Sequence, residues 1–168
     1  MRTGLRSRAE RERFLADVHV GILHVADAAS TLGVPVWYQY TPSAGVSVIT
    51  SNSSRKGRAI QRAARFGLVA QVEEVPYRYV SVDGPVVESR PCEFERDLVP
   101  MAVRYLGEEA GTRYAAAWRD AGIDDTYVSI MQPERWFAVD LVAEFAALGI
   151  GLRPTTSAAP RSKDPEAP

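Results

Sequence analysis

Apolar and polar residues alternate along several short stretches of this chain, and this period of two predicts β-strands. The stretches are residues 18–27, 34–41, 46–51, 67–74, 77–89, 126–132 and 135–141. Residues 27–33 (DAASTLG) predict a loop and residues 42–45 (PSAG) a tight turn, so the first three strands should form an antiparallel meander. Asp83-Gly84-Pro85 interrupts the alternation within residues 77–89 and predicts a bulge or bend.

Helical spacing of apolar residues, combined with capping residues, predicts helices around these strands. Ser7 and Glu10 form a candidate capping box for a first helix that ends near Asp17. Further helices are expected at residues 54–65, at 92–120 (two helices, separated near Gly107 and Gly111) and at 141–149. Six or seven strands, few helices and short connections favour a mainly β fold, a small β-barrel with helical decoration.

The composition narrows the class of protein. The 168 residues suit one domain, expected at residues 1–150, and the Pro- and Ser-rich residues 151–168 predict a disordered tail. A net charge of −1 argues against a nucleic-acid partner. One cysteine, Cys92, excludes an internal disulfide, and without a leader or membrane-length apolar run the expected location is cytoplasmic, with no membrane partner.

The segment SNSSRKGR (residues 51–58) places cations directly after a serine-rich turn. Thr50 ends a predicted strand, and the N–H groups and positive dipole end of the next helix point at the same place. Arg55 and Lys56 lie in the first helical turn, where a cation is unfavourable unless an anion offsets it. The segment is therefore either a phosphate cradle or a well-capped, solvated helix surface; Arg58, Arg62 and Arg65 favour the second interpretation for their own face.

Five stretches, in this order, resemble a known family. They are FLADVHVGILHVAD (14–27), GVPVWYQY (33–40), VITSNSSRKGRAIQRAARFGLVAQVE (48–73), EEVPYRYVSVDGPV (73–86) and QPERWFAVD (132–140). Together they are similar to the pyridoxamine 5′-phosphate oxidase-like, FMN-binding split β-barrel superfamily. The resemblance covers about residues 10–140 and implies an antiparallel split β-barrel with peripheral helices. It also implies a homodimer that holds two cofactors at the subunit interface.

The resemblance implies roles for several residues in cofactor binding. The cofactor phosphate would be held at the serine-rich turn, and the strand of residues 36–39 would lie along the ring. Trp136 would come from the closing strand, and Arg78, next to Tyr79, would lie near the interface. The implied cofactor-binding residues are Val36, Trp37, Tyr38, Gln39, Thr50, Ser51, Ser54, Arg55, Lys56, Arg78 and Trp136.

The same resemblance implies a redox function but leaves its cofactor open. The segment DLVAEFAALGIGLRP (140–154) does not match the C-terminal tail of the true oxidase, so vitamin B6 oxidation is not expected. Relatives of this type use FMN or the deazaflavin coenzyme F-420, and a few bind haem. The expected function is an oxidoreductase that transfers hydride between such a cofactor and a small conjugated substrate. The alternatives are a binding or carrier protein for flavin, deazaflavin or haem without turnover, and a structural dimer with a vestigial site.

The remaining chemically versatile residues have simpler interpretations. Trp37 and Tyr38 are neighbours on a strand and must point to opposite faces, so one of them belongs to the core or an interface. Tyr114 and Trp118 are at helical spacing and indicate helix packing. His19 and His24 should lie on opposite faces of one strand and Cys92 has acidic neighbours, so we expect neither a metal site nor a nucleophile and name no catalytic residue.

Overall fold

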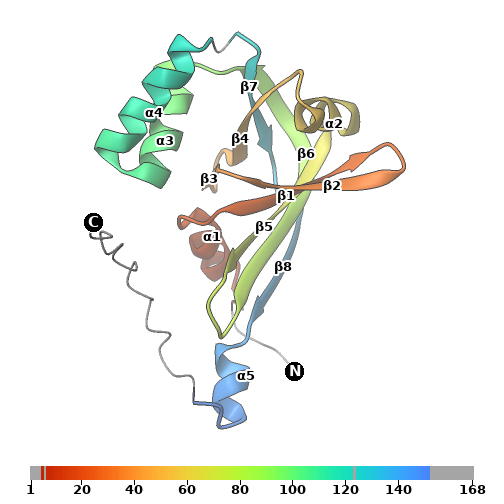
Figure 1. The fold of residues 1–168 in the computed structure, drawn as a ribbon. Helices are drawn as coiled ribbons and strands as arrows, with labels where there is room; N and C mark the ends of the chain where they lie inside the picture. The colour runs from red at the N-terminus through yellow and green to blue at the C-terminus, as the bar shows by residue number, and fades with distance from the viewer. Residues whose placement is uncertain (1–4, 6, 123, 152–168) are drawn as a thin grey trace, which may run out of the picture.

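A computed structural model describes residues 5, 7–122 and 124–151, and Figure 1 shows how its strands and helices are arranged. The strands are β1 (Gly21–Asp27), β2 (Ser30–Val36), β3 (Tyr38–Thr41), β4 (Gly45–Ser51), β5 (Arg65–Val72), β6 (Arg78–Pro91), β7 (Thr126–Met131) and β8 (Arg135–Asp140). The helices are α1 (Arg8–Ala16), α2 (Arg55–Ala63), the π-helical turn η1 (Phe94–Leu98), α3 (Val99–Leu106), α4 (Glu108–Asp120) and α5 (Val142–Ala147).

All strand pairs are antiparallel, and the sheet curls into a half-barrel in the order β2-β1-β5-β6-β7-β4-β3. The long strand β6 joins the two halves of this sheet. Residues 78–83 of β6 pair with β8 on one side and β5 on the other, whereas residues 86–91 pair with β7. This arrangement confirms the predicted split β-barrel with peripheral helices.

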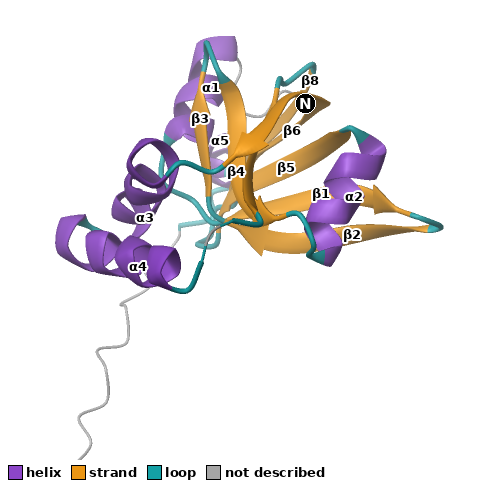
Figure 2. Cartoon of the chain, turned by 90° about the horizontal axis from the view of Figure 1, so that it is seen from above, coloured by secondary structure: helices purple, strands orange, loops and turns teal. Residues whose placement is uncertain are grey.

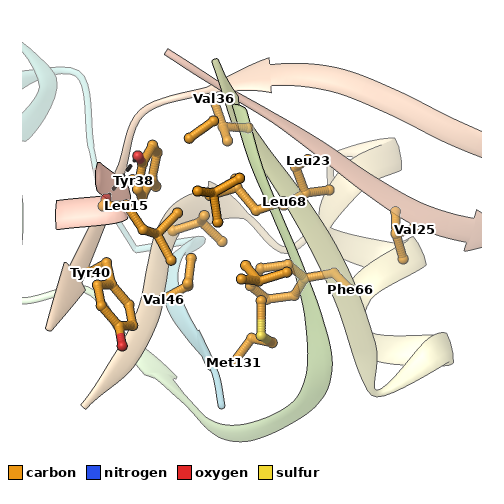
Figure 3. Close-up of a cluster of buried hydrophobic side chains, with 14 of the residues drawn as sticks. Leu15, Leu23, Val25, Val36, Tyr38, Tyr40, Val46, Phe66, Leu68 and Met131 are labelled. Carbon is orange, nitrogen blue, oxygen red and sulfur yellow. Dashed lines mark hydrogen bonds between the residues drawn. The ribbon is translucent and has the colours of Figure 1, made fainter. Parts of the chain in front are cut away.

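The barrel interior is filled by the inward-facing residues of the strands and by helix α1 (Figure 3). Leu23, Val46 and Leu68 are fully buried there and come from three different strands. Tyr38 is also fully buried, and its hydroxyl donates a hydrogen bond of 2.9 Å to the backbone carbonyl of Leu15. This hydrogen bond ties the end of α1 to β3 and satisfies a polar group that would otherwise be costly to bury.

A second apolar cluster lies outside the barrel, between the sheet and the α3–α4 pair, which stands beside β3 and β4 in Figure 2. Leu98, Ala102 and Ala115 come from the helical side, and Val128 comes from β7. Gly111 does not separate the two helices, as the sequence suggested, but lies inside α4. A Cβ atom there would come within 2.5 Å of the Val103 backbone, so Gly111 permits the close approach of α3 and α4.

Several predicted elements are confirmed at nearly the predicted bounds. The capping box of α1 is formed by Ser7 and Glu10, and α2 begins after its cap residue Ser54. The predicted loop over residues 27–33 is wrong, because Ser30 already pairs with Asp27 and the turn contains only two residues. The small polar residues of β2 suggested a loop, but they form the exposed end of a hairpin.

The predicted meander is also wrong, because the stretch 34–41 is two strands rather than one. The chain leaves β2 after Val36 and enters β3 at Tyr38, and these two strands occupy opposite ends of the sheet order. Residues 83–85 do not interrupt β6; its register shifts slightly later, between Val86 and Glu88. The predicted tail, residues 151–168, lies outside the described residues except for Gly151. Among the described residues, no helix has both the length and the apolarity to cross a membrane.

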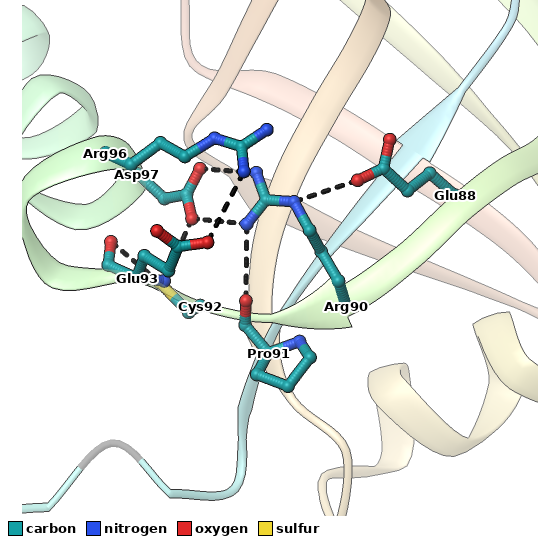
Figure 4. Close-up of polar contacts among 7 residues, drawn as sticks. All are labelled: Glu88, Arg90, Pro91, Cys92, Glu93, Arg96 and Asp97. Atoms are coloured by element: carbon teal, nitrogen blue, oxygen red, sulfur yellow. Dashed lines mark hydrogen bonds and ion pairs between the residues drawn. The ribbon is translucent and has the colours of Figure 1, made fainter.

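An ion-pair cluster fastens η1 to the second half of β6 (Figure 4). Arg90 donates two hydrogen bonds, of 2.6 and 2.7 Å, to the two carboxylate oxygens of Asp97, and a third, of 2.9 Å, to Glu88. The side chains of Arg90 and Asp97 are only 18% and 10% exposed. Burial opposes ionisation of Asp97, but the hydrogen bonds from Arg90 and the Glu93 N–H outweigh it and lower the pKa of this carboxyl.

The Asp97→Ala variant should be destabilised by about 3 kcal/mol, because it leaves a largely buried guanidinium without its bidentate partner. In the parent, the pKa of Asp97 is lower in the folded than in the unfolded chain. The contribution of the pair is therefore complete above the ordinary value of 3.8 and is lost as the pH falls through the folded-state value. Urea unfolding at several pH values measures both effects.

The control is Arg96→Ala, in the same turn. Arg96 pairs with Glu93 at 3.3 Å, and both side chains are well exposed, so the free energy of unfolding should change by less than about 1 kcal/mol. Equal losses in the two variants would contradict the role given to the Arg90–Asp97 pair.

Candidate functional site

A cavity of about 320 Å³ lies between the outer face of the sheet, the start of α2 and the α3–α4 pair. Its volume is at the lower end of the range typical of small-molecule sites, roughly 300–1,000 Å³. The walls are aromatic or aliphatic apart from one lysine. The lining residues are Val20, Pro35, Val36, Trp37, Ile49, Lys56, Leu98, Met101, Tyr114 and Trp118.

Trp37 is the central aromatic residue of this cavity. It occupies the single position between β2 and β3, and its ring stacks on Tyr105 with centroids 4.9 Å apart and planes inclined by 5°. The centroid of the Tyr114 ring lies 5.2 Å from that of Trp37, and the centroid of the Trp118 ring lies 6.1 Å from that of Tyr114. These rings form a continuous aromatic wall, which can accommodate a flat conjugated molecule.

Tyr105 holds the Trp37 segment in place through its hydroxyl group. The hydroxyl accepts a hydrogen bond of 3.0 Å from the Tyr38 N–H and lies 2.7 Å from the His19 carbonyl, to which it donates. Tyr105 therefore ties α3 to both the start of β1 and the start of β3. Burial raises the pKa of this phenol, so it stays protonated at neutral pH.

Lys56 is the only charged residue that lines the cavity within the part of the chain that the structure describes. It lies in the first turn of α2, where Ser54 caps the helix by accepting a hydrogen bond of 3.0 Å from the Gly57 N–H. No carboxylate or hydrogen-bond acceptor among the described residues pairs with its ammonium group. Burial lowers the pKa of Lys56 because desolvation disfavours the charged form. An anionic ligand would supply the missing partner.

The serine-rich turn already holds an anion, the carboxylate of Asp125. The hydroxyls of Ser51 and Ser53 both donate to one oxygen of Asp125, and the Ser53 N–H donates to the same oxygen at 3.0 Å. These hydrogen bonds lower the pKa of Asp125. The turn therefore has the donor chemistry predicted for a phosphate cradle, but a side chain from the segment before β7 uses it.

Arg55 is directed away from the cavity, although it neighbours Lys56 in the sequence. Its guanidinium pairs with Asp27 at 2.7 Å, and Arg62 pairs with the other oxygen of the same carboxylate at 2.5 Å. Side chains in consecutive positions of a helix point about 100° apart, which explains why two adjacent cations have separate environments. Both arginines fasten α2 to the tip of the β1–β2 hairpin.

The other predicted site residues are dispersed around the fold. Val36 borders the cavity next to Trp37, but its side chain, like that of Tyr38, belongs to the barrel core (Figure 3). Thr50 is 5% exposed, and its hydroxyl lies 3.3 Å from that of Ser54. Gln39 is exposed and lines a different, neighbouring cavity.

Arg78 and Trp136 lie near α1 and do not line the cavity. The Arg78 guanidinium is 5.3 Å from the centre of the Phe14 ring, and Trp136 packs edge-on against Tyr40 at 5.8 Å. Both residues carry a buried nitrogen, Nε of Arg78 and Nε1 of Trp136, that has no hydrogen-bond partner among the described residues. The structure thus brings together Val36, Trp37 and Lys56 but neither of these two residues.

The neighbouring cavity, of about 180 Å³, shares Ile49 and Met101 with the first. Gln39 and Ser47 give it a polar side, and the Arg90–Asp97 pair closes it toward η1. The two cavities therefore lie along one face of the β3–β4 strand pair, underneath the helices.

Sequence reasoning missed the contribution of α3 and α4 to the site. The helical spacing of Tyr114 and Trp118 indicates helix packing, and the two rings do contact each other, but they also line the cavity. Their spacing of four residues places both rings on one helix face, and that face is only partly covered. Tyr105 and Met101 carried no distinguishing signal, because their positions follow an ordinary helical period.

The histidines and the cysteine have structural surroundings. His19 precedes β1 and stacks on Phe14 with centroids 4.5 Å apart, while the ring of His24 lies directly over Gly67. Burial, with a smaller contribution from Asp97, raises the pKa of the Cys92 thiol to about 11, so Cys92 is a poor nucleophile at neutral pH. Among the described residues, no group of three or more His, Cys, Asp or Glu is placed to hold a metal ion.

Comparisons with known proteins identify the fold. No family model matches the sequence, and no curated protein matches it. A conserved hypothetical protein from Mycobacterium tuberculosis is similar with a TM-score of 0.69 and 18% sequence identity, over 94% of this chain and 99% of that one. An F420 reductase is similar with a TM-score of 0.60 and 16% identity, over 75% of this chain and 94% of that one. A putative pyridoxamine 5′-phosphate oxidase from Listeria innocua is similar with a TM-score of 0.52 and 12% identity, over 75% of this chain and 92% of that one. FAD-binding and haem-storage proteins are similar as well. The likeness to these structures shows the fold of the chain, a split β-barrel.

The Tyr105→Phe variant should lose about 1–3 kcal/mol of stability, because it keeps the stack on Trp37 but leaves the buried Tyr38 N–H and His19 carbonyl unpaired. The environment of Trp37 should loosen in parallel. Chemical denaturation and the tryptophan emission of the folded protein measure these two changes.

Tyr114→Phe is the matched control, because no hydrogen bond to the Tyr114 hydroxyl occurs among the described residues while its ring also contacts Trp37. Its free energy of unfolding should stay within about 0.5 kcal/mol of the parent. If both variants behaved alike, the hydroxyl of Tyr105 would not be what holds this segment.

Proposed function

We propose that the cavity binds the ring of a flavin-type cofactor and that the chain is an oxidoreductase acting on a small conjugated substrate. FMN is the first candidate, the deazaflavin coenzyme F-420 the second, and haem the third. The observation that carries the proposal is the unpaired Lys56 ammonium at the edge of an aromatic cavity. Such a cavity offers stacking to a conjugated ring and one charge-assisted contact to its anionic group.

The residues of the cavity fit a flavin ring better than they fit a full phosphate cradle. Trp37 and Tyr114 supply flat surfaces, and Met101 joins the cavity to its smaller neighbour. For the phosphate, Lys56 and the N–H groups at the start of α2 remain, because Asp125 engages Ser51 and Asp27 engages Arg55. The proposed phosphate site thus contains fewer donor groups than the sequence suggested.

A bound flavin or deazaflavin would supply the hydride chemistry. The chain's own residues would bind the cofactor, orient its ring and exclude water from it. Trp37, fixed by Tyr105, would set the plane of the ring, and Lys56 would set the position of the anionic group. Leu98 and Met101 would keep water from the apolar side of the cavity. No side chain in this list needs to move a proton, which agrees with a reaction whose chemistry belongs to the cofactor.

The similar structures support this class of ligand without choosing its member. They include an F420 reductase, a FAD-binding protein and a haem storage protein. Because one protein of the same fold stores haem, the alternative that this chain is a carrier, which binds a cofactor without turnover, also has support. Turnover, rather than binding, separates these two functions.

The experiment adds FMN, deazaflavin F-420 and haem separately to the purified chain and follows the visible spectrum. Nicotinamide and deazaflavin donors are then offered to each stable complex. Reduction of a bound flavin, followed by its reoxidation by a conjugated acceptor, would support the oxidoreductase. Tight stoichiometric binding without reduction would support the carrier, and failure to bind any of the three would refute the proposal.

The Lys56→Ala variant should bind FMN about 10- to 100-fold more weakly, which corresponds to ~1–3 kcal/mol for the loss of a charge-assisted hydrogen bond. Arg55→Ala is the matched control at the adjacent position: its guanidinium already pairs with Asp27, so FMN affinity should change less than about threefold. Quenching of flavin fluorescence on titration gives both constants. If the two variants lost affinity equally, the phosphate would contact both cations.

We propose further that the chain acts as a homodimer. Val20, Trp118 and Tyr114 line the cavity yet are 52%, 39% and 36% exposed, and Leu106 nearby on α3 is 41% exposed. Large apolar side chains gathered at the rim of a ligand cavity are typical of an interface.

Val20→Glu should therefore shift the dimer toward monomer while leaving the circular dichroism spectrum unchanged. The mass in solution at several protein concentrations measures the shift. His24→Glu, on the neighbouring strand β1, is the control and should keep the parent mass. A parent that is monomeric at all concentrations would contradict the dimer.

A further inference from the structure

Lys56 has a property that phosphate binding does not require. The chain contains 20 lysines and arginines, and only two of them, Lys56 and Lys163, are lysines. Wherever the described part of the chain forms an ion pair, the cation is an arginine. Arginine also matches phosphate geometry better than lysine, because its planar fork can donate two hydrogen bonds. The cavity therefore contains the one cation of the described residues that can also lose its proton and act as a nucleophile.

The surroundings of Lys56 make its ammonium easier to deprotonate than that of an ordinary lysine. The cavity wall is apolar and aromatic, no carboxylate pairs with the ammonium, and burial lowers its pKa. Its position in the first turn of α2 adds the positive end of the helix dipole, which opposes a further positive charge. Desolvation in a hydrophobic pocket and a nearby positive charge are the two usual ways to activate a lysine toward carbonyl compounds.

We propose that Lys56 is a covalent capture site for flat aromatic aldehydes when the cavity holds no cofactor. The neutral amine attacks the carbonyl carbon, and the π-electron pair of the C=O bond moves to oxygen. Loss of water then forms the C=N bond of an imine; the water carries away the oxygen and the two protons of the amine. No oxidant or reductant takes part. The ring of the aldehyde would lie against Trp37, Tyr114 and Trp118, so the same walls that suit a flavin would select aromatic over aliphatic carbonyls.

The test labels the full chain at neutral pH with 2-hydroxybenzaldehyde, in the absence of any flavin. Cyanoborohydride reduces the imine to a stable secondary amine, and peptide mass spectrometry locates it. Lys163 serves as the internal reference. Lys56 should be labelled roughly tenfold faster than Lys163, because the cavity holds the aldehyde beside the amine. With propanal, which has no ring to stack, the ratio of Lys56 to Lys163 labelling should be several-fold lower, because only the lowered pKa of Lys56 then favours it.

Two variants separate capture by the cavity from ordinary lysine reactivity. Lys56→Arg keeps the charge but has no amine that forms an imine, so labelling at this position should disappear while Lys163 is unaffected. Trp118→Ala keeps the amine but removes part of the wall, and should lower the ratio of Lys56 to Lys163 labelling several-fold. Equal labelling of the two lysines by the aromatic aldehyde, or an unchanged ratio in Trp118→Ala, would overturn the proposal.

The outcome is distinguishable from that of the proposed function. Labelling is measured without a flavin, so selective labelling of Lys56 supports capture even if no flavin binds. FMN binding by both the parent and Lys56→Arg, without selective labelling in the parent, would leave the flavin site standing and refute capture. If both proposals hold, saturating FMN should protect Lys56 from the aldehyde, because the two ligands use the same side chain.

Discussion

The alternation of side chains at the β2–β3 junction is the constraint on which both the core and the cavity depend. Tyr38 points into the barrel and Trp37 points out of it, because consecutive residues of an extended chain face opposite sides. The same rule divides β4, where Val46 and Val48 are buried in the barrel and Ile49 lines the cavity. A change of register by one residue would move the cavity wall into the core.

Tyr105 fixes the backbone at the β2–β3 junction, where the strand is interrupted. Trp37 interrupts the strand, so the backbone there has no neighbouring strand to fix it. The Tyr105 hydroxyl takes over this function by bonding the Tyr38 N–H and the His19 carbonyl. The buried Arg90–Asp97 pair fixes η1, the turn that leads into α3, at the other end of the same helical segment. Two polar contacts thus position an apolar wall, whose own contacts are not directional.

The sequence predicted the barrel and the cationic turn, because both depend on local patterns. Strand alternation, the capping box at Ser7 and the start of a helix at Ser54 are all recognised within a few residues. What could not be predicted is where each polar group finds its partner. Asp125 is 72 residues from Ser53, and Asp27 is 28 residues from Arg55. Nothing local to the turn shows that these carboxylates return to it, and the helices that complete the cavity follow ordinary periodicity.

These internal partners change the meaning of the cationic cluster. A group of cations after a serine-rich turn indicates an anion site only if the fold does not neutralise it. Here the fold neutralises most of it: Asp27 pairs with Arg55 and Arg62, and Asp125 occupies the serine donors. Arg58 has no carboxylate partner either, but its guanidinium donates to the Ser53 backbone carbonyl. Lys56 is the cation of this segment that has neither an ion pair nor a hydrogen bond among the described residues, and it lies next to the aromatic rings of the cavity. The specificity of the cavity therefore depends less on the number of positive charges than on which one was left unpaired. Because this residue is a lysine, it can bind an anionic ligand through its ammonium or react with a carbonyl compound through its neutral amine. The local pH, and whether a cofactor occupies the cavity, decide which of the two occurs.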